Sequence, residues 1–231
     1  MVGPRGPRSE QGRVIVDAGG AVVGNVEMRD VHRRRALRLL RARAQETPPP
    51  TRQEARAILL EHLDEKRAAV AFGDLWTALT DAAAEPSAAD YLAWIPEEAT
   101  RFCFPRPDGA DLVMTPDEVA EAQYVNVSVY LARASALSHA LENLNRDNAQ
   151  HEEYLSDIIN ILAQGQRPAG GPYTVRAQYI ENPRHVLGFN NPAELLAAKL
   201  ERCRRVIENP SVTPIVLCTG PMAVAGSTRM Q

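Results

Sequence analysis

The chain has 231 residues, 45% of them hydrophobic, with 29 acidic and 26 basic side chains. This length allows one or two domains with a buried core, and the net charge of −3 gives no overall attraction for nucleic acid or an anionic membrane. No apolar run reaches the roughly 20 residues that span a bilayer, and the first residues lack the apolar core of a secretory signal.

Residues 1–110 are predicted to hold a hairpin followed by helices. Residues 1–12 are rich in Pro, Gly and Arg and are expected to form a disordered tail. Two β-branched runs at 13–17 and 21–28 flank Ala-Gly-Gly and predict the hairpin. Apolar residues at helical spacing, and one short aromatic run, then predict a helical region over 13–110 with helices at 30–46, 53–71, 75–84 and 91–95 and a strand at 101–104.

Residues 111–231 are predicted to open with a long helical region. Thr115 can cap a helix, Pro116 suits its first turn and Glu118 completes a capping box. The chain then contains neither Pro nor Gly until Gly165, which predicts helix to about residue 164, with a break where Asn and Asp cluster at 143–148. Further elements are expected as strands at 173–179 and 213–218 and a helix at 191–207.

An arginine-rich segment, residues 29–43, is one candidate functional surface. It holds seven arginines and His32 against a single acid, Asp30. Because arginine clamps phosphates and carboxylates, the alternative function is a helical binding module for nucleic acid or an acidic protein partner. The segment lacks interleaved aromatic residues and the whole chain is acidic, which favours a solvated helix face. Nucleic acid is therefore not the expected partner.

The cysteines and histidines indicate no metal centre. Cys103, Cys203 and Cys218 are widely spaced and contain no Cys-x-x-Cys pair, which argues against a disulfide framework and a structural zinc site. The five histidines lack the spacing of metal ligands, and no nucleotide-binding or serine-hydrolase motif occurs. We expect a cytoplasmic protein without a metal or another cofactor.

The last thirteen residues carry the most distinctive pattern. They read Thr-Gly-Pro-Met-Ala-Val-Ala-Gly-Ser-Thr-Arg-Met-Gln and follow the strand predicted at 213–218. Glycine lets the backbone approach a ligand closely, and hydroxyl and guanidinium groups can hold phosphate oxygens. The candidate ligand-binding residues are Gly220, Gly226, Ser227, Thr228 and Arg229.

This loop resembles the second conserved loop of the sugar isomerase (SIS) superfamily. The resembling branch contains the N-acetylmuramic acid 6-phosphate etherases and the glucokinase regulatory protein. The match rests on Thr219, Gly220, Pro221 and residues 226–230. The chain has Met222 and Gln231 where that branch has Glu and Lys, and the other phosphate loop of the superfamily has no counterpart here, so no catalytic residue is carried over.

The resemblance implies a phosphorylated sugar of the hexose 6-phosphate type as ligand, and a homodimer. The full-length protein would be a lyase, an isomerase or a regulator. Because the chain ends three residues after Thr228, we expect a C-terminally truncated domain without catalysis as it stands. The expected fold class is α-rich α+β or incomplete α/β. A few short strands would accompany the helices, and 111–231 would lead into a partial sugar-phosphate domain, ending at the first strand-loop of a SIS-type parallel sheet.

Overall fold

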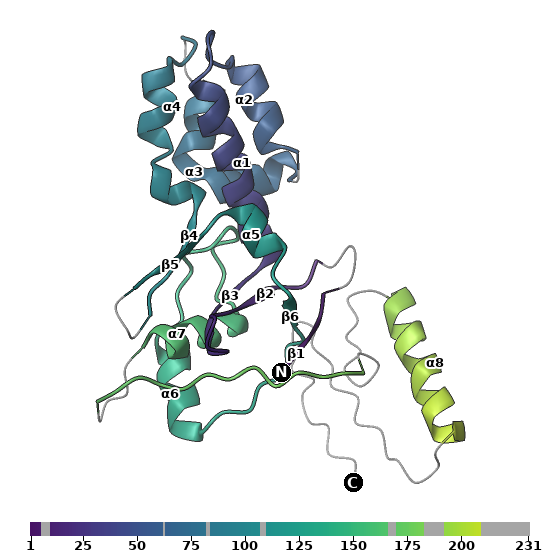
Figure 1. Cartoon of the computed structure of the whole chain (residues 1–231). Helices are drawn as coiled ribbons and strands as arrows, with labels where there is room; N and C mark the ends of the chain where they lie inside the picture. Colours follow the sequence, from purple (N-terminus) through teal and green to yellow (C-terminus); the bar gives the residue numbers. More distant parts are fainter. Residues whose placement is uncertain are drawn as a thin grey trace, which may run out of the picture.

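A group of helices and a small antiparallel sheet make up most of the fold (Figure 1). The computed structural model describes residues 1–231 except 6–9, 62, 82–83, 107–109, 166–169, 183–191 and 209–231. The helices gathered at one end are α1 (Met28–Ala44), α2 (Arg52–Leu59), α3 (Glu65–Asp81) and α4 (Ala88–Trp94). An α-rich α+β fold is therefore confirmed. The domain division near residue 110 stays a prediction.

The main sheet has four strands in the order β1-β6-β2-β3, and each pair of neighbouring strands is antiparallel. These strands are β1 (Val2–Pro4), β6 (Tyr124–Asn126), β2 (Arg13–Val16) and β3 (Val22–Val26). A separate antiparallel pair joins β4 (Phe102–Phe104) to β5 (Leu112–Met114). The hairpin predicted within 13–28 is confirmed, whereas the described strands do not form the parallel sheet expected of a SIS-type domain. The strand predicted at 213–218 lies outside the described residues.

The beginning of the chain belongs to the sheet. The sequence predicts a disordered tail over 1–12, whereas Val2–Pro4 forms strand β1 beside β6. The side chain of Val2 is buried, and Arg5 donates hydrogen bonds to Glu121 at the end of the strand. Hydrogen bonds to β6 and burial of an apolar side chain offset the flexibility that the Pro- and Gly-rich composition indicates.

The helices α1–α4 enclose their own apolar core. Leu40, Leu59, Leu79 and Ile95 are almost completely buried in it, and each such side chain contributes about 1.5–3 kcal/mol relative to exposure. The Tyr91 hydroxyl inside this core donates to the Pro50 carbonyl at 3.1 Å, which satisfies its polar end. The helix predicted at 53–71 is wrong in extent, because α2 ends at Leu59 and α3 begins at Glu65.

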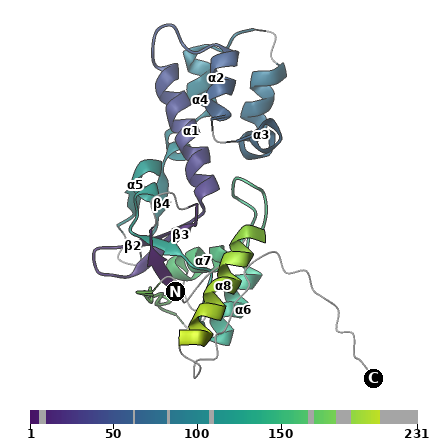
Figure 2. The same cartoon turned by 90° about the vertical axis from the view of Figure 1, so that its right-hand side faces the viewer.

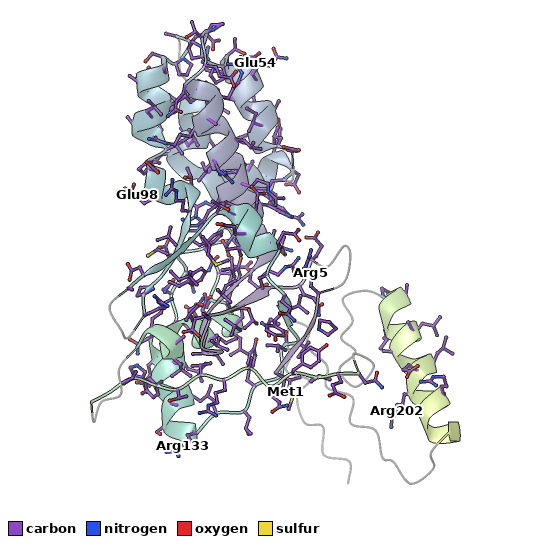
Figure 3. The ribbon with its side chains drawn as sticks, in the orientation of Figure 1. Met1, Arg5, Glu54, Glu98, Arg133 and Arg202 are labelled. Atoms are coloured by element: carbon purple, nitrogen blue, oxygen red, sulfur yellow. The ribbon has the colours of Figure 1, made fainter. Side chains whose placement is uncertain are left out.

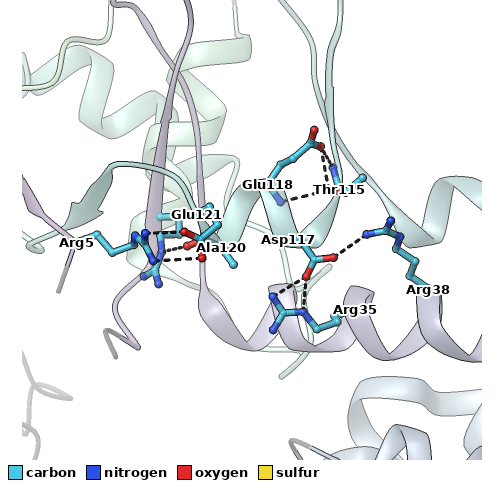
Figure 4. Close-up of polar contacts among 9 residues, drawn as sticks. Arg5, Arg35, Arg38, Thr115, Asp117, Glu118, Ala120 and Glu121 are labelled. Atoms are coloured by element: carbon cyan, nitrogen blue, oxygen red, sulfur yellow. Dashed lines mark hydrogen bonds and ion pairs between the residues drawn. The ribbon is translucent and has the colours of Figure 1, made fainter. Parts of the chain in front are cut away.

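The long helix predicted from 115 to 164 is wrong. The capping box at its start is confirmed, since Thr115 caps a helix and Glu118 returns the bond (Figure 4). That helix, however, ends within two turns. The segment continues as α5 (Pro116–Ala120), β6, α6 (Ala134–Glu142), the 3₁₀ turn η2 (Leu155–Asp157) and α7 (Ile158–Gln164). Residues 124–130 read Tyr-Val-Asn-Val-Ser-Val-Tyr, an alternating β-branched pattern that favours a strand over a helix.

The last described element is α8 (Pro192–Glu208), which confirms the helix predicted at 191–207. Figure 1 shows this helix standing apart from the sheet and from the other helices. Among the described residues, no helix is long and apolar enough to cross a membrane.

Candidate functional site

The arginines of α1 bind other parts of the same chain. Arg35 and Arg38 both pair with the carboxylate of Asp117 on α5, at 2.8 and 2.7 Å (Figure 4). Arg34 donates to the backbone carbonyl of Glu98 at 3.0 Å, and its guanidinium lies 4.6 Å from the centre of the Phe102 ring. These contacts fix α1 against α5 and against the turn η1 (Glu97–Thr100).

The same use of arginine continues along the helix. Arg41 donates to the backbone carbonyls of Leu92 and Ile95 at the end of α4, and Arg43 donates to the carbonyl of Pro48 at 2.8 Å. Most of the charge that suggested a surface for nucleic acid or an acidic partner is therefore engaged in holding the fold together. The alternative function built on residues 29–43 is wrong for this physical reason.

A polar cavity of about 300 Å³ lies where α1 leaves the sheet. Its walls come from the junction of β3 and α1, from β4, from the loop at 147–148 and from α7. Figure 3 shows the side chains that fill this region between the helical group and the sheet. The polar and charged residues that line the cavity are Asn25, Glu27, Asp30, Arg33, Arg34, Cys103, Asp147, Asn148, Asp157, Asn160 and Gln164.

Asn160 fixes one wall of the cavity by pairing with the backbone of β3. Its Oδ1 accepts from the backbone N–H of Asn25 at 2.6 Å, and its Nδ2 donates to the Asn25 carbonyl at 2.9 Å. β3 is an edge strand of the sheet, so these two groups have no neighbouring strand to bind. The amide of Asn160 replaces that strand and anchors α7 to the sheet. Its Nδ2 also donates to Asp157 at 3.1 Å.

Asp30 and Glu27 fix the other walls. Asp30 accepts a hydrogen bond from the backbone N–H of Ala149 at 2.7 Å, which holds the loop carrying Asp147 and Asn148 against α1. Glu27 accepts a hydrogen bond from the hydroxyl of Ser156 at 2.7 Å, which holds η2. Each acid therefore keeps a lining segment in place while remaining part of the cavity wall.

Burial and mutual repulsion raise the pKa values of two acids of the cavity, Asp157 and Asp30. Partial burial, aided by the nearby carboxylates of Asp30 and Glu27 and opposed by the hydrogen bond from Asn160, raises the pKa of Asp157 to about 6. Burial likewise raises the pKa of Asp30, although its bond from Ala149 opposes the shift. The ionised acids are thus held in an environment that favours uncharged hydrogen-bond donors over further anions.

Two buried polar atoms at the cavity lack hydrogen-bond partners. They are Oδ1 of Asn25 and Nε of Arg33, and within the described part of the chain only Arg56 Nε shares this property. Asn25 is only 3% exposed. Buried polar groups are nearly always satisfied in folded proteins, and exceptions often mark a site that binds something. Here the two residues that carry these atoms both belong to the lining of one cavity.

The raised pKa of Asp157 predicts a pH-dependent effect on stability. Its folded pKa, about 6, lies above its unfolded value of about 3.9. Ionisation of Asp157 therefore destabilises the folded chain, and this loss of stability is absent below pH 4 and reaches its full size above pH 6. We expect Asp157→Asn to stabilise the chain by about 1 kcal/mol at pH 7 after allowance for solvent screening, and by nothing at pH 4. Urea unfolding at both pH values measures this, and an equal effect at both would contradict it.

The cavity does not contain the residues that the sequence predicts as a binding site. Gly220, Gly226, Ser227, Thr228 and Arg229 lie outside the described residues. The cavity was missed because its members are spread from Asn25 to Gln164. One signal was present: Asn25 and Glu27 interrupt the otherwise apolar strand at 21–28. Within the described residues, no group of three or more His, Cys, Asp or Glu side chains could hold a metal ion.

The fold is α-rich α+β, and a polar cavity of about 300 Å³ lies between the helical group and the sheet. Comparison with known proteins gives relatives named bifunctional protein GlmU. The chain is 36% identical over 98 residues to that of Mycobacterium leprae, which covers 42% of this chain and 18% of the relative. The protein of Mycobacterium sp. strain KMS is 39% identical over 83 residues, which cover 36% of this chain and 16% of the relative. The protein of Geobacter sulfurreducens is 34% identical over 104 residues, which cover 45% of this chain and 20% of the relative.

The similarity is partial on both sides. The chain spans between 16% and 20% of the length of these relatives. No family model matches the chain, and no solved structure matches it. The comparisons therefore give related proteins without placing this chain in a family.

The relatives correct the function expected from the C-terminal loop. The similarity to proteins named bifunctional protein GlmU points to a function other than the isomerase, lyase or regulator expected of a SIS-type protein. Similarity over 98 residues outweighs a pattern of thirteen residues. The sugar-phosphate function of SIS type, with its lyase or isomerase chemistry, is therefore wrong. The resemblance of residues 219–231 itself stays a prediction outside the described residues.

Proposed function

We propose that the chain is part of a sugar nucleotidyltransferase related to GlmU and that the polar cavity binds the sugar ring of its nucleoside diphosphate sugar, which is the product of nucleotidyl transfer to a sugar phosphate. The observation that carries this proposal is a cavity of about 300 Å³ whose lining combines the acids Glu27, Asp30 and Asp157 with the arginines Arg33 and Arg34 and the amides Asn25 and Asn160. The similarity to GlmU supports the class of reaction. The cavity supports the part of the substrate that binds there.

The chemistry of the cavity favours a polyhydroxylated ring. A sugar hydroxyl both donates and accepts hydrogen bonds, so one ligand can accept from the arginines of the lining and donate to its carboxylates. The carboxylates of Glu27, Asp30 and Asp157 accept from hydroxyls but repel phosphate at such short range. The sugar ring therefore suits the interior of the cavity, and the phosphates of the substrate would lie outside it.

A binding titration with a matched pair of variants tests the proposal. Arg33→Met removes the unsatisfied donor and its charge, so we expect the affinity for a nucleoside diphosphate hexose to fall about 10-fold or more. Arg38→Met, five residues further along α1, removes only an exposed pair with Asp117 and should leave affinity unchanged. Isothermal titration calorimetry with uridine, adenosine and guanosine diphosphate hexoses measures both.

The same titration includes the matching nucleoside diphosphates without the sugar. Under the proposal these bind more weakly than the hexose derivatives, because the cavity contacts the sugar. Equal affinity with and without the sugar would contradict the placement of the sugar. Saturable binding of none of these compounds would contradict the proposed function as a whole.

A further inference from the structure

An apolar groove lies on the other side of the fold from the helical group, between the sheet and α7. Its volume is about 300 Å³. Its apolar lining comes from β1, β2, β3, α7 and the segment around Val175. The residues that line it include Val2, Val14, Val22, Ile159, Leu162 and Val175. Leu131 also lines it and is 97% exposed, so a large apolar side chain stands free in solvent beside an open apolar groove.

A second apolar surface is open on α8. Leu196 and Leu200 are 58% and 61% exposed, and Cys203 is also exposed. The spacing of these three residues is i, i+4 and i+7, which places them on one face of the helix. Figures 1 and 3 show α8 apart from the rest of the chain, and Figure 3 labels Arg202 on this helix. We define this Leu196–Leu200–Cys203 surface as the α8 stripe.

A short connection joins the two surfaces. The backbone N–H of Ile180 donates to the Val2 carbonyl at 2.9 Å, so the chain at Ile180 is attached to strand β1 at the groove. Pro192, the first residue of α8, follows twelve residues later. Twelve residues span at most about 40 Å when extended, and a link of this length keeps the helix at an effective concentration in the millimolar range near the groove.

We propose that α8 docks its stripe into the apolar groove of the same chain. An amphipathic helix that inserts residues at i, i+4 and i+7 into an apolar groove is a common mode of recognition. Docking would remove the exposed leucines from water, Leu131 beside the groove and Leu196 and Leu200 on α8, which is favourable. The tether favours the helix of the same chain over that of a second copy, since protein at micromolar concentration competes poorly with a millimolar effective concentration.

Disulfide trapping tests this docking in the full chain. The native Cys203 lies in the α8 stripe, and Leu131→Cys places a second thiol at the groove, in a background with Cys103→Ser and Cys218→Ser. We expect mild oxidation at low micromolar protein to give a disulfide-linked monomer. Leu141→Cys in α6, also exposed but outside the groove lining, should give none. A disulfide-linked dimer, or equal reaction of both variants, would overturn the proposal.

Hydrogen exchange gives a second readout that does not depend on thiols. Leu196→Asp combined with Leu200→Asp should prevent docking without touching the fold of the sheet. We expect the backbone amides of α7 to exchange several-fold faster in this variant, because the groove they line would stay open. Unchanged exchange in α7 would overturn the proposal, and neither experiment depends on whether the polar cavity binds a sugar.

Discussion

Replacement of Asn160 by alanine is expected to destabilise the chain by about 2–4 kcal/mol, since two backbone groups of a buried edge strand lose their partners. The Asn160 amide satisfies both the N–H and the carbonyl of Asn25, and Asn25 is buried. A buried group without a partner costs the full free energy of its removal from water. This cost exceeds the net free energy that the hydrogen bonds themselves contribute.

Urea unfolding followed by circular dichroism measures this loss. The matched control is Asn143→Ala at the end of α6, where the amide makes one exposed bond to the carbonyl of His139 at 2.8 Å. That variant should change stability by less than about 1 kcal/mol. If the two alanine variants lost similar stability, Asn160 would not be the anchor of α7 to the sheet.

Gly24→Ala is expected to cost about 2 kcal/mol or more, because a methyl group there has no space. A Cβ at Gly24 would lie 2.5 Å from Cδ1 of Phe104, and the Phe104 ring is buried between β3 and its neighbours. The ring cannot move aside without disturbing the core that it shares with Phe102 and Val119. The strain would fall directly beside the polar cavity, which Phe104 also lines.

Gly3→Ala serves as the control for this prediction. A Cβ at Gly3 in β1 would meet only valine methyl groups, the nearest at 3.2 Å, which a small rotation can relieve. Thermal unfolding should therefore show a clearly lower midpoint for Gly24→Ala than for Gly3→Ala. Similar midpoints for the two variants would mean that Phe104 yields to the added methyl group.

Local patterns in the sequence predicted the elements whose causes are local. The hairpin of β2 and β3 follows from two β-branched runs around Ala-Gly-Gly, and the start of α5 follows from the Thr115–Glu118 capping box. The helix α8 likewise follows from the pattern after Pro192. In each case the determining residues lie within a few positions of one another.

Features that depend on distant residues could not be predicted in this way. Strand β6 forms within a stretch that lacks Pro and Gly, because β1 and β2 supply its partners from the start of the chain. The cavity depends on the bond between Asn160 and Asn25, which are 135 positions apart. The arginines of α1 looked like a binding surface because their partners, such as Asp117, lie far along the chain.

A sugar that enters the polar cavity should protect Cys103 from alkylation, and this protection is the measurement to make first. Cys103 is one of the residues that line the cavity, and its exposed thiol donates to Asp111 at 3.3 Å, whereas Cys203 on α8 lies outside the lining and serves as the reference thiol. In the presence of a saturating nucleoside diphosphate hexose, we predict several-fold slower alkylation of Cys103 by iodoacetamide and an unchanged rate at Cys203. An unchanged rate at Cys103 would mean that no sugar binds in the polar cavity.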